Sequence, residues 1–193
     1  MNLRTKHDEL LCMVWFRFSG PHAQTQQDLA GTYFDDIGLG TCSGPGCVPT
    51  VEASINTAGQ GAAAQVVLGC PNRLCPKADI GAVKAAVIQD QVQVIIMAMG
   101  LDSKIESEGK DRTDIRLPGQ QLEVIETVLN NSHVGTKLVL LLFNGGTIAI
   151  ESLKNHPALA IVECWYPGAT GATALAETVF GFPGKAELII LTL

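Results

Sequence analysis

Basic residues and long apolar runs are scarce in this sequence. Its 193 residues include 13 Lys and Arg against 19 Asp and Glu, which gives a formal net charge of -6. The sequence has no basic patch, so we expect neither nucleic acid nor an anionic membrane surface as a partner. No apolar run reaches the roughly 18 residues that predict a membrane-spanning helix.

The beginning of the sequence also lacks a convincing signal peptide. Apolar residues 10–16 follow basic ones, but Asp8 and Glu9 interrupt the segment and Arg17 ends it. No small-residue cleavage site comes soon after, as a secretion signal requires. We therefore interpret residues 11–18 as a first β-strand.

Apolar residues are plentiful enough for one domain with a full core, at 47% of the chain. The first third is irregular, with helices predicted over 24–29 and 50–58 and a glycine-rich loop over 31–49. From about residue 65, short apolar runs alternate with segments of helical spacing. The predicted strands are 66–69, 92–99, 137–143 and 158–164, and the predicted helices are 77–88, 120–129, 147–154 and 171–180. This alternation predicts an α/β fold, a mostly parallel sheet with helices on both faces (an α/β sandwich).

Four of the six cysteines form two closely spaced pairs. Cys42 and Cys47 flank one turn, and Cys70 and Cys75 flank another. Such pairs are typical of an oxidising compartment, and both are candidate disulfides. Zinc is the alternative, but its ligands usually lie about two to four residues apart and come with further histidine or cysteine partners. Because histidine is sparse here, we expect no metal site. The other two cysteines lie in apolar runs and are expected in the core.

A cluster of acids follows the apolar run 92–99. Asp102, Glu106 and Glu108 lie within seven residues of each other, and the oppositely charged pair Asp111 and Arg112 comes next. A loop after a buried strand opens at the carboxyl edge of the sheet, where ligands bind in open α/β folds. The cluster is therefore a candidate acid/base site. The alternative is a solvated acidic loop, since charge runs usually face water.

Six segments in a fixed order together indicate a family. They are Gly20-Pro21-His22-Ala23, Gly69-Cys70 through Cys75, the loop from Gly100 to Arg112, Leu117-Pro118-Gly119-Gln120-Gln121, Asn144-Gly145-Gly146, and Tyr166-Pro167-Gly168 with Gly171. Over about residues 19–181, this set resembles the C-terminal α/β sandwich domain of glycoside hydrolase family 3. The β-xylosidase and α-arabinofuranosidase branch is the most similar.

The resemblance implies a retaining, exo-acting O-glycosidase of two domains. A (β/α)8 barrel supplies the aspartate nucleophile in such an enzyme, and the sandwich supplies the general acid/base. A barrel needs roughly 250 residues, so here it must be missing or separate. The resemblance further implies an oligosaccharide substrate from xylan or arabinoxylan, no cofactor, and an extracellular or secretory location for the parent family.

The resemblance also assigns roles within the acidic loop. The family's acid/base is a Glu followed by Gly and then Asp-Arg in some members, which makes Glu108 the first choice. Glu106 is the alternative, because loop lengths vary among members. Asp102 is expected to contact the substrate. For Asp111 and Arg112 we favour a structural ion pair that fixes the loop over contact with the substrate.

Two segments near this loop leave alternatives open. Residues 144–146 either present backbone N–H groups to an anion or form a tight turn between a strand and a helix, and we favour the turn. Trp165 is predicted on the same edge of the sheet as the acidic loop. There it either stacks on a sugar or packs against the protein.

Both ends of the chain depart from the family pattern. We divide the sequence into an atypical N-terminal segment with a first strand (1–18), the family domain (19–181) and a truncated or divergent tail (182–193). We therefore expect a partial chain that is inactive alone. The alternative is a non-catalytic carbohydrate-binding or interaction module, or a relic fragment. A nucleotide-binding domain is disfavoured because G-x-G-x-x-G and G-x-x-x-x-G-K-[ST] are absent.

Overall fold

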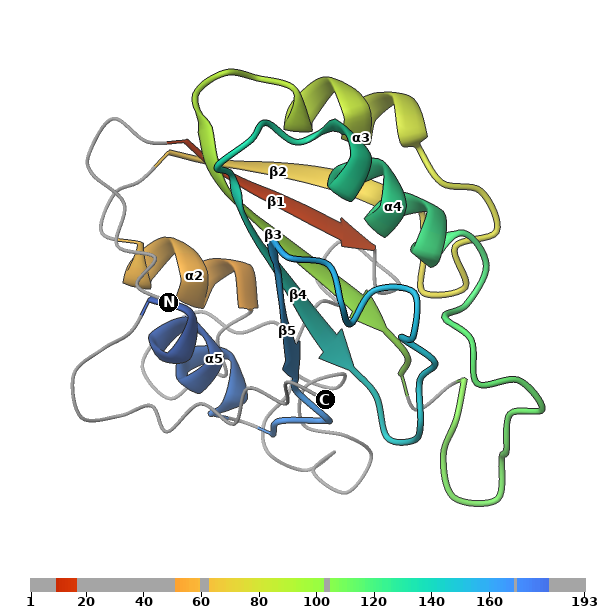
Figure 1. Cartoon of the computed structure of the whole chain (residues 1–193). Coiled ribbons are helices and arrows are strands. Elements are labelled where there is room, and N and C mark those ends of the chain that lie inside the picture. The colour runs from red at the N-terminus through yellow and green to blue at the C-terminus, as the bar shows by residue number, and fades with distance from the viewer. Residues whose placement is uncertain (1–9, 17–50, 60–62, 103–104, 169, 181–193) are drawn as a thin grey trace.

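The sheet of this domain has five strands, all parallel, in the order β2-β1-β3-β4-β5 (Figure 1). The computed structural model describes residues 10–16, 51–59, 63–102, 105–168 and 170–180. The strands are β1 (Leu10–Phe16), β2 (Ala63–Cys70), β3 (Val92–Gly100), β4 (Lys137–Phe143) and β5 (Leu159–Glu163). The helices are α2 (Val51–Ala58), α3 (Ile80–Val87), α4 (Gln121–Asn131) and α5 (Gly171–Phe180).

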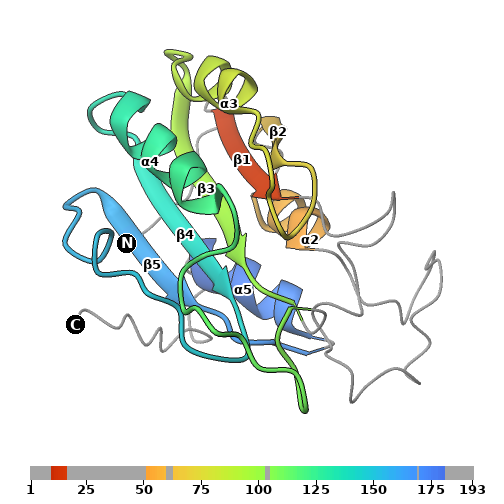
Figure 2. The same ribbon diagram turned by 90° about the vertical axis from the view of Figure 1, so that its right-hand side faces the viewer.

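Helices cover both faces of the sheet, as predicted. Helices α3 and α4 pack on one face, and α2 and α5 pack on the other (Figure 2). All of β3 is buried except Gln93. A strand between two helical layers has this continuous apolar character, because neither of its faces meets water.

Successive residues of the central strands pack alternately into two separate hydrophobic cores. Ile95, Met97 and Leu140 face α3 and α4, whereas Ile96 and Leu141 face α2 and α5. This alternation follows from the two-residue period of a strand. The second core also contains the free thiol of Cys164, so a cysteine from an apolar run lies in the core as predicted.

The strand order has a topological consequence for the site. The chain runs from β1 to β2 on one side and then crosses back to β3 on the other side of β1. The carboxyl ends of β1 and β3 therefore mark the switch point, where connections leave in opposite directions. Ligands of doubly wound sheets bind in the crevice at this point. The acidic loop starts there, at the end of β3.

The prediction of a helix over 147–154 is wrong. The Ala149 amide donates to the Ile115 carbonyl at 2.9 Å, so this stretch lies against the loop that follows β3. Only one turn forms afterwards, closed by hydrogen bonds from the Leu153 and Lys154 amides to the Ile150 carbonyl.

Helix α3 begins later than predicted, at Ile80 rather than residue 77. The Asp79 side chain caps it by accepting from the Ala82 amide. The amides just before the helix have other partners: Asp79 donates to the Gly69 carbonyl and Ala78 to the Gln120 side chain. Residues 77–79 are therefore held outside the helix. The predicted helix over 24–29 and the pair Cys42 and Cys47 lie outside the described residues.

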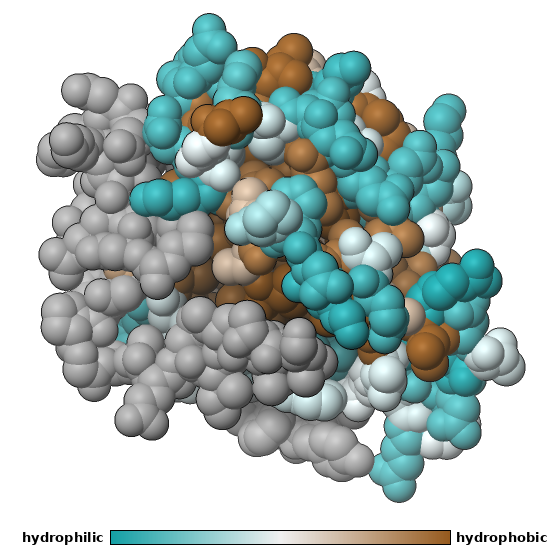
Figure 3. All heavy atoms as spheres, viewed as in Figure 1, coloured by the Kyte–Doolittle hydropathy of each residue, from teal (hydrophilic) through white to brown (hydrophobic). Residues whose placement is uncertain are grey.

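On the face of the molecule drawn in Figure 3, apolar side chains are visible between polar ones. Leu74, Ile115 and Trp165 are more than half exposed, at 55%, 54% and 57%. All three lie in loops that follow carboxyl ends of strands. Among the described helices, none is long and apolar enough to cross a bilayer.

Gly100 is required where β3 ends against β4. It has φ +136°, and a Cβ there would overlap the carbonyl group of Phe143. Gly135 also has positive φ, +96°, but a Cβ there meets nothing within 4 Å. We expect Gly100→Ala to lower the free energy of unfolding by about 2 to 5 kcal/mol, from backbone strain plus overpacking. Gly135→Ala should cost about 1 kcal/mol, from strain alone. Urea denaturation of both variants measures this, and equal losses would contradict it.

Candidate active site

The acidic loop folds into a short hairpin at the carboxyl edge of the sheet. Ser107 and Lys110 exchange two backbone hydrogen bonds, of 3.1 and 2.9 Å. Glu108 and Gly109 form the turn between them, and Gly109 takes the positive φ, +76°. Glu108 is therefore exposed at the tip of the hairpin. We refer to residues 105–112 as the acidic hairpin.

Asp102 lies beneath the acidic hairpin and is 1% exposed. Its carboxylate Oδ1 accepts from the Ile105 amide at 3.2 Å, and its backbone carbonyl accepts from the Ile105 and Glu106 amides. Its Oδ2 is 3.1 Å from Nε of Arg73. The expectation that Asp102 contacts substrate is therefore corrected. This carboxylate is buried and holds the base of the hairpin.

Glu106 makes the ion pair that fixes the hairpin. Its Oε2 accepts from Nε of Arg112 at 2.8 Å, and the two side chains are only 25% and 10% exposed. The predicted pair between Asp111 and Arg112 is wrong on this point: Asp111 is exposed and makes no ion pair among the described residues. Glu106 is closer to Arg112 in the fold because the hairpin turns the chain back on itself.

Arg112 also ties the acidic hairpin to two other loops. Its guanidinium donates to the carbonyl oxygens of Asp114 and Arg116 at 3.0 and 3.3 Å, and to that of Thr147 at 2.6 Å. A guanidinium suits this position, because its fixed fork of donors can serve several acceptors at once. The hairpin is thereby attached to the loop that follows β4.

The glycines after β4 permit this close approach. A Cβ at Gly146 would lie 2.7 Å from Oε2 of Glu106, and one at Gly145 would lie 2.7 Å from the Tyr166 ring. Residues 144–146 thus form a tight turn, as favoured from the sequence, but no helix follows it. The Asn144 side chain closes the turn by donating to the Gly146 carbonyl at 2.8 Å.

Trp165 lies exposed after β5, on the same edge of the sheet as the hairpin. Its backbone has φ +51°, a conformation that costs free energy for a bulky residue. Its amide donates to Oε1 of Glu163 at 3.3 Å. Burial raises the pKa of the Glu163 carboxyl, and hydrogen bonds from the Trp165 amide and the Asn144 side chain oppose that rise.

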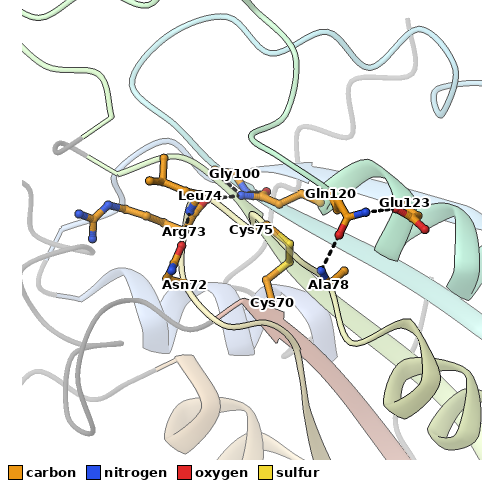
Figure 4. The surroundings of a disulfide bond; sticks show 10 residues. Cys70, Asn72, Arg73, Leu74, Cys75, Ala78, Gly100, Gln120 and Glu123 are labelled. Carbon is orange, nitrogen blue, oxygen red and sulfur yellow. Dashed lines mark hydrogen bonds between the residues drawn. A yellow bond between two sulfur atoms is a disulfide. The ribbon is translucent and has the colours of Figure 1, made fainter.

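A disulfide loop lies beside the end of β3. Cys70 and Cys75 are bonded, as predicted, with their Cα atoms 4.9 Å apart (Figure 4). In the chain-entropy account, closing so small a ring stabilises the folded state by about 2 kcal/mol. Within the described residues, no three His, Cys, Asp or Glu side chains are grouped as a metal site.

Sequence reasoning missed two residues of this region, Arg73 and Gln121. Arg73 is the cation between Cys70 and Cys75, and it faces the buried Asp102. Gln121 is completely buried at the start of α4 and bonds to Gly100. For Gln121, the available signal was a polar residue directly before the apolar positions of the predicted helix 120–129. Its hydrogen-bond partners are 21 and 48 residues away in sequence, so no local pattern indicates them.

Comparison with known proteins shows a family likeness over most of the chain. Residues 17–183 match the family model of the glycosyl hydrolase family 3 C-terminal domain. Beta-D-xylosidase 3 of Arabidopsis thaliana is 31% identical, over 84% of this chain and 19% of its own length. Exo-1,4-beta-xylosidase xlnD of Emericella nidulans is 30% identical, over 90% of this chain and 20% of its own.

A solved structure gives the same result. The GH3 exo-beta-xylosidase XlnD, in complex with a xylobiose aziridine activity-based probe, superposes with a TM-score of 0.69 and 26% identity. The match covers 94% of this chain and 21% of that one. This chain therefore spans about one fifth of the length of the relatives it matches.

The corrected ion pair can be tested by a double-mutant cycle. We expect Glu106→Gln and Arg112→Met each to lower the free energy of unfolding, with a coupling of about 1 kcal/mol between them, because the pair is charge-assisted and mostly buried. Asp111→Asn is the matched control and should change stability by less than about 0.5 kcal/mol. Urea denaturation measures the three single variants and the two double variants, Glu106→Gln with Arg112→Met and Asp111→Asn with Arg112→Met. Coupling of Arg112 to Asp111 in place of Glu106 would contradict the assignment.

Proposed function

The chain belongs to the glycosyl hydrolase family 3 C-terminal domain family, and on that premise we propose that it carries the general acid/base of a retaining, exo-acting, β-xylosidase-like O-glycosidase. The family resemblance inferred from the sequence is thus confirmed. The observation that carries the proposal is the acidic hairpin, which extends a carboxylate from the carboxyl edge of the sheet near its switch point. Relatives named as β-xylosidases support the sugar class.

Glu108 is the proposed acid/base. It is exposed at the hairpin tip, so its carboxyl group can reach a sugar held outside this domain. In the first step it protonates the leaving glycosidic oxygen, and in the second it accepts a proton from the water that attacks the sugar. Glu106 remains the alternative. We favour Glu108 because Glu106 is already paired with Arg112, which gives it a structural task.

The nucleophile is proposed to come from a second domain. Retention requires two carboxyl groups roughly 5 to 5.5 Å apart across the scissile bond. An acid that stands on an exposed hairpin meets this requirement when another domain carries the nucleophile against the same edge. The exposed apolar side chains of Leu74, Ile115 and Trp165 on this edge suit such a contact. We propose a (β/α)8 barrel as the partner and a xylan or arabinoxylan oligosaccharide as the substrate.

The Cys70–Cys75 disulfide supports an oxidising compartment for the chain. We therefore propose an extracellular or secretory location. Both carboxylate roles use protein side chains and water alone, so the proposed reaction requires no cofactor.

The catalytic proposal is tested by adding a separately expressed family 3 barrel to this chain. We expect no turnover by the chain alone and hydrolysis of xylobiose and aryl xylosides by the mixture. Glu108→Gln should lower kcat on xylobiose by about 100-fold to 10,000-fold, because the leaving oxygen then lacks a proton donor. An aryl xyloside with an acidic phenol leaving group needs less protonation. The same substitution should therefore reduce the rate of its glycosylation step by a smaller factor.

Glu106→Gln is the matched control and should lower kcat less than Glu108→Gln. The reverse ranking would assign the acid/base to Glu106. If the wild-type mixture hydrolyses neither substrate while circular dichroism shows both parts to be folded, the catalytic proposal is refuted.

A second candidate function is sugar binding without chemistry, which the exposed and strained Trp165 favours. An aromatic face beside polar groups suits a pyranose ring. Under this alternative, titration calorimetry of the chain with xylo-oligosaccharides should detect binding at millimolar sugar, and Trp165→Ala should weaken it at least tenfold. Glu108→Gln should leave it unchanged, as should Val134→Ala, which removes an exposed apolar residue elsewhere. No heat at millimolar sugar would exclude the alternative.

A further inference from the structure

Gln121 is a completely buried polar side chain whose bonding groups all have partners. Its Nε2 donates to the carbonyl oxygens of Arg73 and Gly100 at 2.8 and 2.9 Å. Its Oε1 accepts from the Gly100 amide at 2.8 Å. Burying an amide costs free energy unless it is hydrogen-bonded, and these three hydrogen bonds offset that cost. It joins the start of α4, the end of β3 and the disulfide loop.

The disulfide loop in turn fixes the position of Arg73. The Cys70–Cys75 bond closes the loop, and the Asn72 side chain accepts from the Leu74 amide at 2.9 Å (Figure 4). With its carbonyl held by Gln121, Arg73 has little freedom in its backbone. Its guanidinium points away from the disulfide and lies 3.1 Å from Oδ2 of Asp102.

Asp102 passes this constraint to the acidic hairpin. It follows Gly100 by two residues, so both bonds of Gln121 to Gly100 set where it starts. Its remaining acceptors hold the amides of Ile105 and Glu106 at the base of the hairpin. Gln121 is therefore connected to the hairpin by two routes, through the backbone of Gly100 and through the Arg73–Asp102 ion pair.

We propose that Gln121 is a positioning residue, which acts with Arg73 through Asp102 to set where the acidic hairpin and its Glu108 stand. The inference rests on the proposed function for its catalytic meaning, but the positioning itself does not require that function. The hydrogen bonds of Gln121 and the ion pair of Arg73 lead to Gly100 and Asp102, at the base of the hairpin. Their effect is on geometry, and a misplaced acid loses rate because proton transfer depends on position.

Hydrogen exchange of the full chain, followed by NMR, tests the positioning. Gln121→Glu removes the amide group whose two N–H donors bond to the Arg73 and Gly100 carbonyls. Arg73→Met removes the cation that faces Asp102. In both variants we expect the Ile105 and Glu106 amides to exchange at least tenfold faster. The amides of Ile96 and Leu140, in the centre of the sheet, should keep their wild-type rates.

Two controls separate positioning from general stability. Gln120→Glu makes the same chemical change one residue earlier, at a side chain that bonds to Ala78 and Glu123, and should leave the hairpin amides unchanged. Arg73→Lys keeps the charge and should restore part of the protection. If Gln121→Glu does not fold, Arg73→Met and Arg73→Lys decide. Unchanged hairpin rates, or an equal rise at Ile96 and Leu140, would overturn the proposal.

The xylobiose assay with the separately expressed barrel measures the effect on catalysis. With an active wild-type mixture, Arg73→Met should lower kcat at least tenfold with little change in KM, and an unchanged kcat would overturn the link to catalysis. A silent wild-type mixture would instead refute the proposed function. The exchange results would stand in that case, so the two failures are distinguishable.

Discussion

At the carboxyl end of β3, the chain must leave the sheet without burying backbone N–H and C=O groups that have no hydrogen-bond partner. This constraint governs the rest of the site, because β3 is buried along almost its whole length. Gly100 makes the exit possible by adopting a conformation closed to other residues beside Phe143. Gln121 then satisfies both the amide and the carbonyl of Gly100, as the cost of an unpaired buried peptide group requires. The acidic hairpin starts from this fixed point.

Three acids that look equivalent in the sequence have different environments in the fold. Asp102 is buried against Arg73, and Glu106 is mostly buried against Arg112. Glu108 alone is exposed, at the tip of the hairpin. Asp102 and Glu106 hold the base of the hairpin, and each has a cation close enough to offset the cost of removing its carboxylate from water. This difference in exposure is the physical basis for the proposal that Glu108 is the acid/base.

Periodicity predicted the elements whose burial is simple. The residue limits of β4 and α5 agree with the predicted 137–143 and 171–180, because a doubly covered strand and a one-sided helix have clear patterns. The segment 147–154 also has helical spacing, but the Ala149 amide bonds to the loop after β3 instead. The same limit applies to Arg112, whose partner proved to be six residues back rather than adjacent. Neither contact has a local signal.

The α/β class was predictable from the alternating periods of the sequence, and Cys70 and Cys75 were a candidate disulfide because of their spacing. The family was recognised from its resemblance to the order of six short segments. Which acids are buried and how the hairpin is held became visible in the fold alone. The Gln121 bonds join residues 21 and 48 positions apart, and the strand order that brings them together arises from packing two helical layers on one sheet. Long-range hydrogen bonds of this kind form only in the assembled fold. The same is true of the Arg73–Asp102 ion pair, so no local sequence pattern indicates these partners.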